Sequence, residues 1–109
     1  MSGHPTDADP DLVWLAGLLE GEGSFDLHHG RYPRVRLAMT DRDIVERAAS
    51  LMGTSCRVTL RAAPYQALWN ANVHGEKAAS LMRRLLPYMG SRRSGRIAQI
   101  LGHAPRRAA

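Results

Sequence analysis

The chain has 109 residues, a formal net charge of +5, a pI near 10.3 and a hydrophobic fraction of 44%. This length accommodates one domain with a real core and excludes a second independent domain. No apolar run approaches the roughly 20 residues that cross a bilayer, which excludes a membrane protein. The polar, acidic start has no features of a signal or transit peptide, so we expect a cytoplasmic protein.

The positive charge is almost entirely arginine, because Lys77 is the only lysine. An excess of arginine indicates a polyanionic partner such as nucleic acid, since a guanidinium forms paired hydrogen bonds with phosphates and with guanine edges. A GC-rich genome would produce the same bias, so the positions of the arginines must decide. Cys56 has no partner for an internal disulfide, and its alternation with apolar neighbours predicts a small buried side chain.

Four segments have helical character, with apolar residues on one face and polar residues on the other. They cover residues 11–20, 41–52, 76–86 and 91–101. Thr40 or Asp41 is expected to cap the second helix, which ends at Gly53, and Pro87 ends the third. The apolar faces predict helices that pack on a common core.

Segments of alternating apolar and polar residues, typical of half-buried strands, lie between the helices. They cover residues 24–29, 33–39, 55–61 and 66–73. The resulting order is α-β-β-α-β-β-α-α, which predicts an α+β fold with two antiparallel hairpins and helices on one sheet face. We expect this domain over residues 11–102, between an N-terminal tail of residues 1–10 and a basic C-terminal tail of residues 103–109.

The alternation also assigns a face to each strand residue. The second strand turns Val35 and Leu37 toward the core, and the third is expected to do the same with Val58 and Leu60. The side chains predicted for the opposite face are Ser24, Asp26, His28, Arg34, Arg36, Arg57, Thr59, Arg61, Gln66, Asn70 and Asn72. Arginine suits guanine, asparagine and glutamine suit adenine, and aspartate suits cytosine, so this face is predicted to bind double-stranded DNA. The alternative is an ordinary solvated face, on which arginines block edge pairing.

Residues 15–23 form the most informative stretch, with the sequence LAGLLEGEG. The small residues Ala16, Gly17 and Gly21 on an apolar helix leave a stripe along which a second helix can approach closely. We therefore expect a homodimer that forms through this helix. The predicted interface consists of Leu12, Trp14, Leu15, Ala16, Gly17, Leu19 and Glu20.

Two glutamates lie at the C-terminal end of the same helix, where the helix dipole is already negative. The charges of Glu20 and Glu22 are each unfavourable there by about a few tenths to 1 kcal/mol, and a divalent cation would remove the conflict. Two such helices side by side would bring acids from two chains together for metal-assisted phosphodiester hydrolysis. The plainer alternative is a pair of exposed glutamates before a turn.

This stretch resembles the LAGLIDADG signature of homing endonucleases, with five of nine positions identical and conservative changes at the other four. Three further segments are similar to the family. They are residues 37–41 (LAMTD), residues 69–73 (WNANV) followed by Gly75, and residues 86–88 (LPY) before a basic helix. The resemblance extends from about residue 12 to residue 101.

The resemblance implies a saddle-shaped sheet astride the major groove of DNA. It implies a homodimer that cuts both strands of a pseudo-palindromic site and leaves short 3′ overhangs. The cofactor would be Mg²⁺ or another divalent cation, bound by Glu22 and the carbonyl of Gly21, with Glu20 in a supporting role. Asp41 matches a polar position of the family that orients solvent.

The chain departs from the family at several positions. Glutamate replaces aspartate at both acidic positions, which lengthens the reach to a metal. Arg92, or else Arg93, falls where the family often has a lysine near the scissile phosphate; arginine keeps the charge but does not act as an acid, and Arg93 is otherwise expected to contact DNA. Val45 stands where some relatives have a basic residue.

Two other functions are compatible with these observations. One is a cleavage-deficient DNA- or RNA-binding relative, such as an intron maturase or a regulator. The other is a structural oligomerisation module, which would lack salt-dependent DNA binding. The histidines do not have the spacing of metal ligands, and we expect His28, His29, His74 and His103 to be DNA contacts or surface residues.

Overall fold

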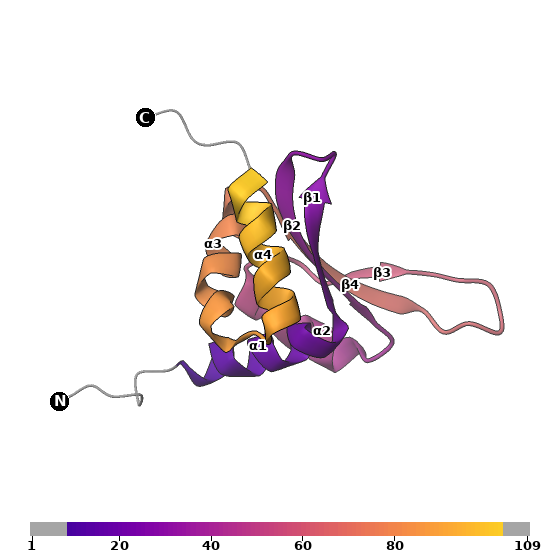
Figure 1. The fold of residues 1–109 in the computed structure, drawn as a ribbon. Coiled ribbons are helices and arrows are strands. Elements are labelled where there is room, and N and C mark those ends of the chain that lie inside the picture. Colours follow the sequence, from indigo (N-terminus) through magenta and orange to yellow (C-terminus); the bar gives the residue numbers. More distant parts are fainter. Residues whose placement is uncertain (1–8, 104–109) are drawn as a thin grey trace.

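Two antiparallel hairpins provide a sheet, and helices cover one of its faces, in residues 9–103, the part of the chain that the computed structural model describes (Figure 1). The elements are α1 (Pro10–Glu22), β1 (Gly23–His28), β2 (Tyr32–Met39), α2 (Arg42–Met52), β3 (Arg57–Thr59), β4 (Leu68–His74), α3 (Glu76–Leu85), the short 3-10 helix η2 (Leu86–Tyr88) and α4 (Ser91–His103). The four strands are ordered β1-β2-β4-β3. The predicted α+β class and order of elements are confirmed.

The ends of the domain lie slightly beyond the predicted ones. α1 begins at Pro10, whose fixed φ suits the first helical position, and the Asp9 carboxylate accepts a hydrogen bond from the Asp11 N–H (2.9 Å). Asp9 and Pro10 therefore belong to the folded domain, and α4 continues to His103. The rest of both predicted tails, residues 1–8 and 104–109, lies outside the described residues.

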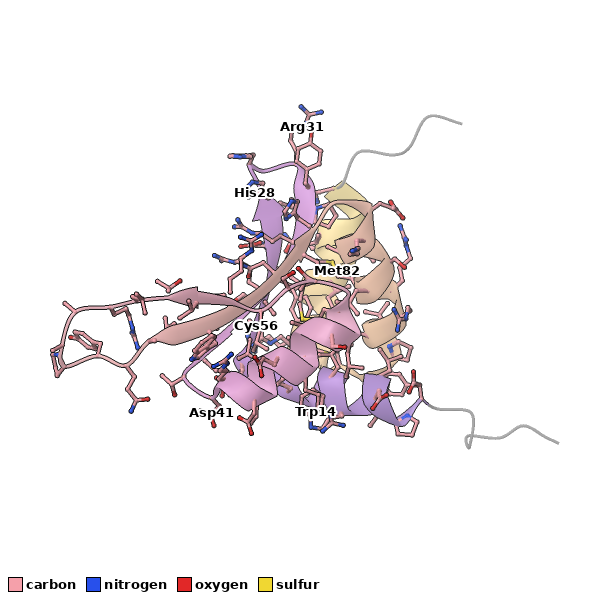
Figure 2. The ribbon with its side chains drawn as sticks, turned by 180° about the vertical axis from the view of Figure 1, so that it is seen from behind. Trp14, His28, Arg31, Asp41, Cys56 and Met82 are labelled. Atoms are coloured by element: carbon pink, nitrogen blue, oxygen red, sulfur yellow. The ribbon has the colours of Figure 1, made fainter. Side chains whose placement is uncertain are left out.

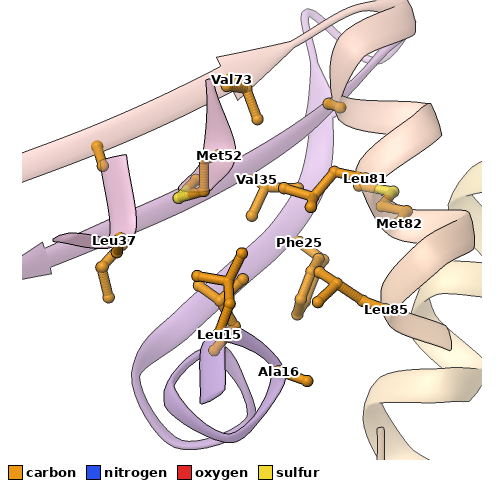
Figure 3. Close-up of a cluster of buried hydrophobic side chains, with 14 of the residues drawn as sticks. Leu15, Ala16, Phe25, Val35, Leu37, Met52, Val73, Leu81, Met82 and Leu85 are labelled. Atoms are coloured by element: carbon orange, nitrogen blue, oxygen red, sulfur yellow. The ribbon is translucent and has the colours of Figure 1, made fainter. Parts of the chain in front are cut away.

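The core forms between the sheet and the helices (Figure 3). Phe25 of β1, Val35 of β2 and Val73 of β4 point toward the helices, where they meet Leu15 of α1 and Leu85 of α3. The largest fully buried side chains are Leu15, Leu19, Leu37, Met82, Leu85, Ile97, Ile100, Val35 and Val45. Burial of each such side chain contributes about 1.5–3 kcal/mol relative to exposure, so the inward-facing residues of β1, β2 and β4 fix which sheet face remains open.

The hairpin of β3, residues 60–67 and the start of β4, here called the arm, extends away from the helices (Figure 1). Val58 is 45% exposed and Leu60 is 81% exposed, so the prediction that both face the core is wrong. Side chains of a strand still alternate between the two sheet faces, but all three residues of β3 are exposed, because the arm extends away from the helices (Figure 1). Cys56 is half-buried and not buried, and its partial burial raises the pKa of the thiol.

The turn from α1 into β1 leaves no room for a side chain at its glycine. Gly23 follows the last helical residue, and its N–H donates to the Leu19 carbonyl. A Cβ atom on Gly23 would lie 2.8 Å from Leu19 Cδ2 and 2.9 Å from the Leu19 carbonyl oxygen, well inside van der Waals contact. The chain therefore passes from helix to strand within one residue, which carries Glu22 to the start of the sheet.

Replacement of Gly23 by alanine is expected to lower the free energy of unfolding by about 1–3 kcal/mol, because the added methyl group must displace the last turn of α1. The matched control is Gly95→Ala in α4, where a Cβ atom meets no other atom within 4 Å. This change is expected to be neutral or to stabilise by up to about 1 kcal/mol. Urea unfolding measures both variants, and equal stability of the two would contradict the steric explanation.

Candidate nucleic-acid interface and acidic site

The sheet face that points away from the helices, here called the outer face, carries most of the polar strand residues. Directly opposed residues of antiparallel strands project on the same face. The pairing of β1, β2 and β4 gives two rows across the outer face: Ser24, Arg36 and Asn72 in one, and Asp26, Arg34 and His74 in the next. The register thus places cationic, amide and hydroxyl groups side by side.

The outer face continues onto the arm. Arg57 lies opposite Asn70, and Thr59 lies opposite Leu68. Asn70 Nδ2 donates a hydrogen bond to Thr59 Oγ1 (2.9 Å), which ties β4 to β3 on this face. The arginines of β2 and β3 therefore share one face, as the strand alternation predicts.

Two residues predicted for the outer face lie instead in the loop at the end of the arm. Arg61 Nε donates to the Gln66 carbonyl (2.7 Å), and the Arg61 guanidinium lies 5.4 Å from the centroid of the Tyr65 ring. Arg61 and Gln66 are both exposed, but neither belongs to a strand. Their directions are therefore set by the loop and not by strand alternation.

A groove of about 350 Å³ lies on the outer face. It is lined by Glu22, Ser24, Arg36, Leu37, Ala38, Asn70 and Asn72. Glu22, the exposed last residue of α1, is thereby brought beside side chains that can contact bases or phosphates. A carboxylate, a guanidinium and two amides in one depression combine a ligand for a hard cation with groups that bind a polynucleotide.

The Glu20 side chain connects α1 to the start of α4. Its Oε1 accepts a hydrogen bond from the Gly90 N–H (2.8 Å), immediately before α4. A carboxylate is favourable at the N-terminus of a helix, because the N–H groups and the helix dipole are positive there. Glu20 therefore stabilises the contact between α1 and α4, and Glu22 is the acid of the motif that faces the groove.

Arg93 is the basic residue of α4 that contacts the acidic end of α1. Its Nε donates to the Glu20 carbonyl (3.1 Å), and its guanidinium lies 5.7 Å from the centroid of the Phe25 ring. Arg92 is exposed. Arg96 was not predicted to contribute, yet its Nε donates to the Phe25 carbonyl (3.2 Å) on the edge strand β1. Its spacing of three from Arg93 places both on one side of α4 and is the signal in the sequence.

Asp41 precedes α2 and is exposed. It accepts a hydrogen bond from Thr40 Oγ1 (3.3 Å), and its carboxylate does not cap the helix. Gly23 lies opposite Leu37, so the start of β1 and the end of β2 meet at the same end of the sheet. Figure 2 places Asp41 at this end, beside α2, and places His28 at the other end, near the tip of the β1–β2 hairpin. Asp41 is therefore on the same side of the domain as Glu22, although no hydrogen bond among the described residues joins them.

A network of charged groups connects β1 and β2 on the outer face. Arg34 donates from Nε and Nη2 to the two oxygens of Asp26 (2.8 and 3.0 Å), and Arg36 Nη2 donates to Asp26 Oδ2 (2.8 Å). The hydrogen bond from Arg34 lowers the pKa of Asp26, with burial opposing it and the charge of Arg36 assisting it. The same hydrogen bond raises the pKa of Arg34. Asp26, predicted as a possible reader of cytosine, is thus engaged within the chain.

His28 completes this network. Arg34 Nη1 lies 2.7 Å from His28 Nδ1, which can accept the hydrogen bond only when the imidazole is neutral. Desolvation lowers the pKa of His28, and the nearby His29, Arg34 and His74 lower it further, while Asp26 opposes them. The His28 ring also stacks on His74, with 5.6 Å between the ring centroids. The contact with Arg34 and the lowered pKa therefore both favour the neutral form of His28.

The face of α1 predicted to form a dimer is partly turned inward. Leu15, Ala16 and Leu19 are buried in the core of the chain itself, so the prediction that they contact a second copy is wrong. The buried side of α1, which includes Ala16, packs on the core of its own chain. The Trp14 ring lies beneath Arg47 of α2, with 3.9 Å from the guanidinium to the ring centroid.

The opposite side of α1 is exposed and has few side-chain atoms. Val13, Gly17 and Gly21 follow one another at intervals of four residues, and all are exposed. A Cβ atom on Gly17 or Gly21 would meet no atom within 4 Å. The packing of the single chain therefore does not require glycine at either position, in contrast to Gly23.

Residues 9–103 contain no group of three or more His, Cys, Asp or Glu side chains placed to hold a metal ion. One chain offers a single exposed motif carboxylate, that of Glu22, to the groove.

In the same range of residues, no helix has both the length and the apolar character needed to cross a membrane.

The outer face thus combines the donors of Arg36, Asn70 and Asn72 with the exposed carboxylate of Glu22 in one groove. The fold is that of the homing endonucleases. The chain is similar to I-CvuI in complex with its target in the presence of Ca, with a TM-score of 0.61, 16% identity, and coverage of 84% of this chain and 63% of that one. It is similar to I-CeuI complexed with DNA, with a TM-score of 0.62, 14% identity, and coverage of 92% and 56%.

A third similar structure is that of I-TnaI, with a TM-score of 0.52, 14% identity, and coverage of 86% of this chain and 69% of that one. The chain thus spans less than two thirds of the length of the I-CvuI and I-CeuI chains. No family model matches the sequence, and no curated protein matches it significantly. At these identities the likeness establishes the fold, and it confirms the fold implied by the LAGLIDADG-like motif.

Acid is expected to destabilise the domain through His28. Because the pKa of His28 is below its ordinary value of 6.5, protonation costs more in the folded than in the unfolded chain. The stability that neutral His28 provides is complete above about pH 6.5 and is lost as the pH falls through the lower folded pKa. The lowered pKa of Asp26 acts in the same direction only below its ordinary value of 3.8.

The measurement is urea unfolding at about pH 7.5 and about pH 5, in the wild-type chain and in His28→Asn. Asparagine keeps a hydrogen-bond acceptor near the position of Nδ1 but does not titrate. His28→Asn is expected to lose less stability than the wild type over this range, whereas His103→Asn, at the end of α4, is expected to behave as the wild type. An identical loss in all three proteins would exclude His28 as the titrating group.

Proposed function

We propose that two copies of this chain form a metal-dependent, site-specific endonuclease that cuts both strands of a pseudo-palindromic DNA site. The observation that carries the proposal is the groove that joins Glu22 to Arg36, Asn70 and Asn72. A phosphodiester held beside Glu22 would belong to the same duplex whose bases lie along the outer face. Recognition and hydrolysis would therefore be coupled through one surface.

The outer face suits the major groove of duplex DNA. Arginine can pair with the O6 and N7 atoms of guanine, and asparagine with the N6 and N7 atoms of adenine. The positive charge adds sequence-independent attraction, since each neutralised phosphate releases counterions. The similar I-CvuI and I-CeuI structures are complexes with a target and with DNA, respectively, which supports DNA as the partner.

A second copy would dock along the exposed side of α1. Val13, Gly17 and Gly21 form a stripe with little side-chain bulk, so two helix backbones could approach closely there. A twofold axis along this stripe would bring the two α1 ends together and align the outer faces of both chains. Each chain alone supplies one motif carboxylate to its groove, and a dimer would supply a pair.

The donor groups at the end of α1 fit a hard divalent cation. Glu22 is exposed and lines the groove, and Mg²⁺ usually takes few protein carboxylates and keeps several waters. Glu22 and the Gly21 carbonyl would hold the ion. When bound, Mg²⁺ would neutralise charge on the phosphate and lower the pKa of a bound water.

Other residues of the chain would orient the reacting groups. Asp41, at the same end of the sheet, would accept a hydrogen bond from a water near the phosphate. Arg93, held at the end of α1 by its bond to the Glu20 carbonyl, would stabilise negative charge on the phosphate, with exposed Arg92 as the alternative. An arginine remains protonated, so this role is electrostatic and the proton for the leaving oxygen must come from water.

Glu22→Gln is expected to abolish cleavage in Mg²⁺ and to leave DNA affinity unchanged or slightly higher, because the variant keeps the size of the side chain but removes a negative charge near phosphate. The target is first selected by the wild-type protein from random duplexes and is then incubated with Mg²⁺. Cleavage and binding of that site are measured for each variant in parallel.

The matched control is Glu20→Gln, which removes the same charge two residues away. It is expected to weaken the contact with Gly90 by roughly 0.3–1 kcal/mol and to leave cleavage largely intact. Undiminished cutting by Glu22→Gln would remove the assigned role. Sequence-specific binding without cutting by the wild type would favour a cleavage-deficient relative. A neighbour illustrates such a separation, since I-CvuI holds an I-CreI target uncleaved in the presence of Mg.

Gly17→Leu is expected to convert the dimer to a monomer, because a leucine would fill the stripe between the two α1 helices. The monomer should fold normally, since Gly17 has open space around it, and leucine has a better helix propensity than glycine by roughly 0.8 kcal/mol. Sedimentation measures the assembly. The control is Gly95→Leu in α4, which makes the same change at another open helix position and should remain dimeric. A dimer that survives Gly17→Leu with unchanged stability would refute this interface.

A further inference from the structure

Asp26 is the only acidic residue in the strands of the described chain. Because it lies on the outer face, its negative charge opposes the binding of a polyanion there. Its carboxylate is half-buried and accepts from Arg34 and Arg36, so it is neither free to contact a base nor a general surface charge. Its role must therefore lie in what it does to the two arginines.

Arg34 and Arg36 differ in how many of their donors the network uses. Arg34 donates from Nε and Nη2 to Asp26, and its Nη1 lies against His28 Nδ1, so each of its three nitrogens has a partner. Its side chain is 23% exposed. Three of the five N–H groups of Arg34 are thus engaged within the chain, so Arg34 has fewer donors left for a base than Arg36.

Arg36 is held by a single hydrogen bond, from Nη2 to Asp26 Oδ2. Within residues 9–103, its Nε and Nη1 have no hydrogen-bond partner, and its side chain is 47% exposed. Nη2 carries two hydrogens, so Nη1 and Nη2 together can still form the paired donors that guanine O6 and N7 require. Arg36 also lines the groove that contains Glu22.

We propose that Arg36 reads one guanine in each half-site, and that Asp26 and Arg34 are positioning residues that fix the Arg36 guanidinium without contacting bases. This inference rests on the proposed DNA-binding function of the outer face. An arginine fixed before binding loses less side-chain entropy when it pairs with guanine, which favours discrimination between bases. His28, near the tip of the β1–β2 hairpin, contacts Nη1 of Arg34 and so restrains the Arg34 guanidinium as well.

The position of the guanine follows from the rows of the sheet. Arg36 shares its row with Ser24 and Asn72, and this row is one step closer to Glu22 than the row of Asp26 and Arg34. The base pair read by Arg36 should therefore lie toward the centre of the whole site. A base pair read by the second row, if there were one, would lie farther out.

The test is a base-preference profile measured by competition binding, without any need for cleavage. Arg36→Ala is expected to relax preference for guanine at one position of each half-site by about 5- to 150-fold. Asp26→Asn and Arg34→Lys are expected to relax preference at the same position by a smaller factor, with the other positions unchanged. Asp26→Asn should also bind non-specific duplex more tightly, since it removes a negative charge.

The controls separate positioning from charge and from folding. Glu76→Gln removes one negative charge on α3, away from the outer face, and should leave the profile unchanged. Asp26→Glu keeps the carboxylate and should retain part of the preference that Asp26→Asn loses. Urea unfolding of each variant identifies any loss of base preference that reflects misfolding. Arg36→Ala should disturb folding least, because the Arg36 side chain is exposed.

The outcomes are distinguishable. If Arg34→Lys or Asp26→Asn changes preference at a different base pair from Arg36→Ala, those residues read bases themselves and the inference fails while DNA binding stands. If Arg36→Ala weakens binding equally for all sequences, Arg36 contacts phosphate and the inference fails. If the wild-type protein has no sequence preference and no salt-dependent affinity for DNA, both the inference and the proposed function fail.

Discussion

The close contact between Gly23 and Leu19 determines where the acids of the motif point. Successive residues of a helix are separated by about 100°, so Glu20 and Glu22 project to nearly opposite sides of α1. The abrupt passage into β1 then places Glu22 at the start of the sheet and leaves Glu20 facing Gly90. One acid is consequently structural and the other faces the groove, although both have the same chemistry.

The same junction holds α4 against the edge of the sheet. Glu20 accepts from the N–H before α4, while Arg93 and Arg96 donate to carbonyls of α1 and β1. An exposed edge strand is a site of unwanted pairing, and Arg96 occupies a carbonyl of the edge strand β1. The residues that bring positive charge to the acidic end of α1 therefore also stabilise the fold. Any role of Arg93 in phosphate binding consequently depends on the contact between α4 and α1.

Sequence alternation predicted the faces of β1, β2 and β4 because helices cover the inner side of those strands, so a period of two coincides with burial at Val35 and Leu37. It failed at Val58 and Leu60, because alternation states only that two faces differ and not that one is covered. The prediction for α1 failed at Leu15, Ala16 and Leu19 for a related reason. An apolar helix with small residues can pack on its own sheet or on another chain, and the pattern is the same in both cases.

The network around Asp26 could not be predicted from residue types, since it depends on the register of β1 and β2, which pairs Asp26 with arginines eight and ten positions later in the sequence. A list of base-reading residue types counts every arginine of the outer face as available. The structure reduces this number, because Arg34 is engaged by Asp26 and His28 through three of its five N–H groups, and Arg61 is held by its loop. A face of free arginines would bind any duplex through its phosphates. Ion pairs within the protein lower this attraction, which does not depend on the DNA sequence. A larger share of the binding energy then comes from the few side chains that contact bases. If the outer face binds DNA as proposed, the carboxylate of Asp26 would thus reduce general affinity and increase discrimination between sequences.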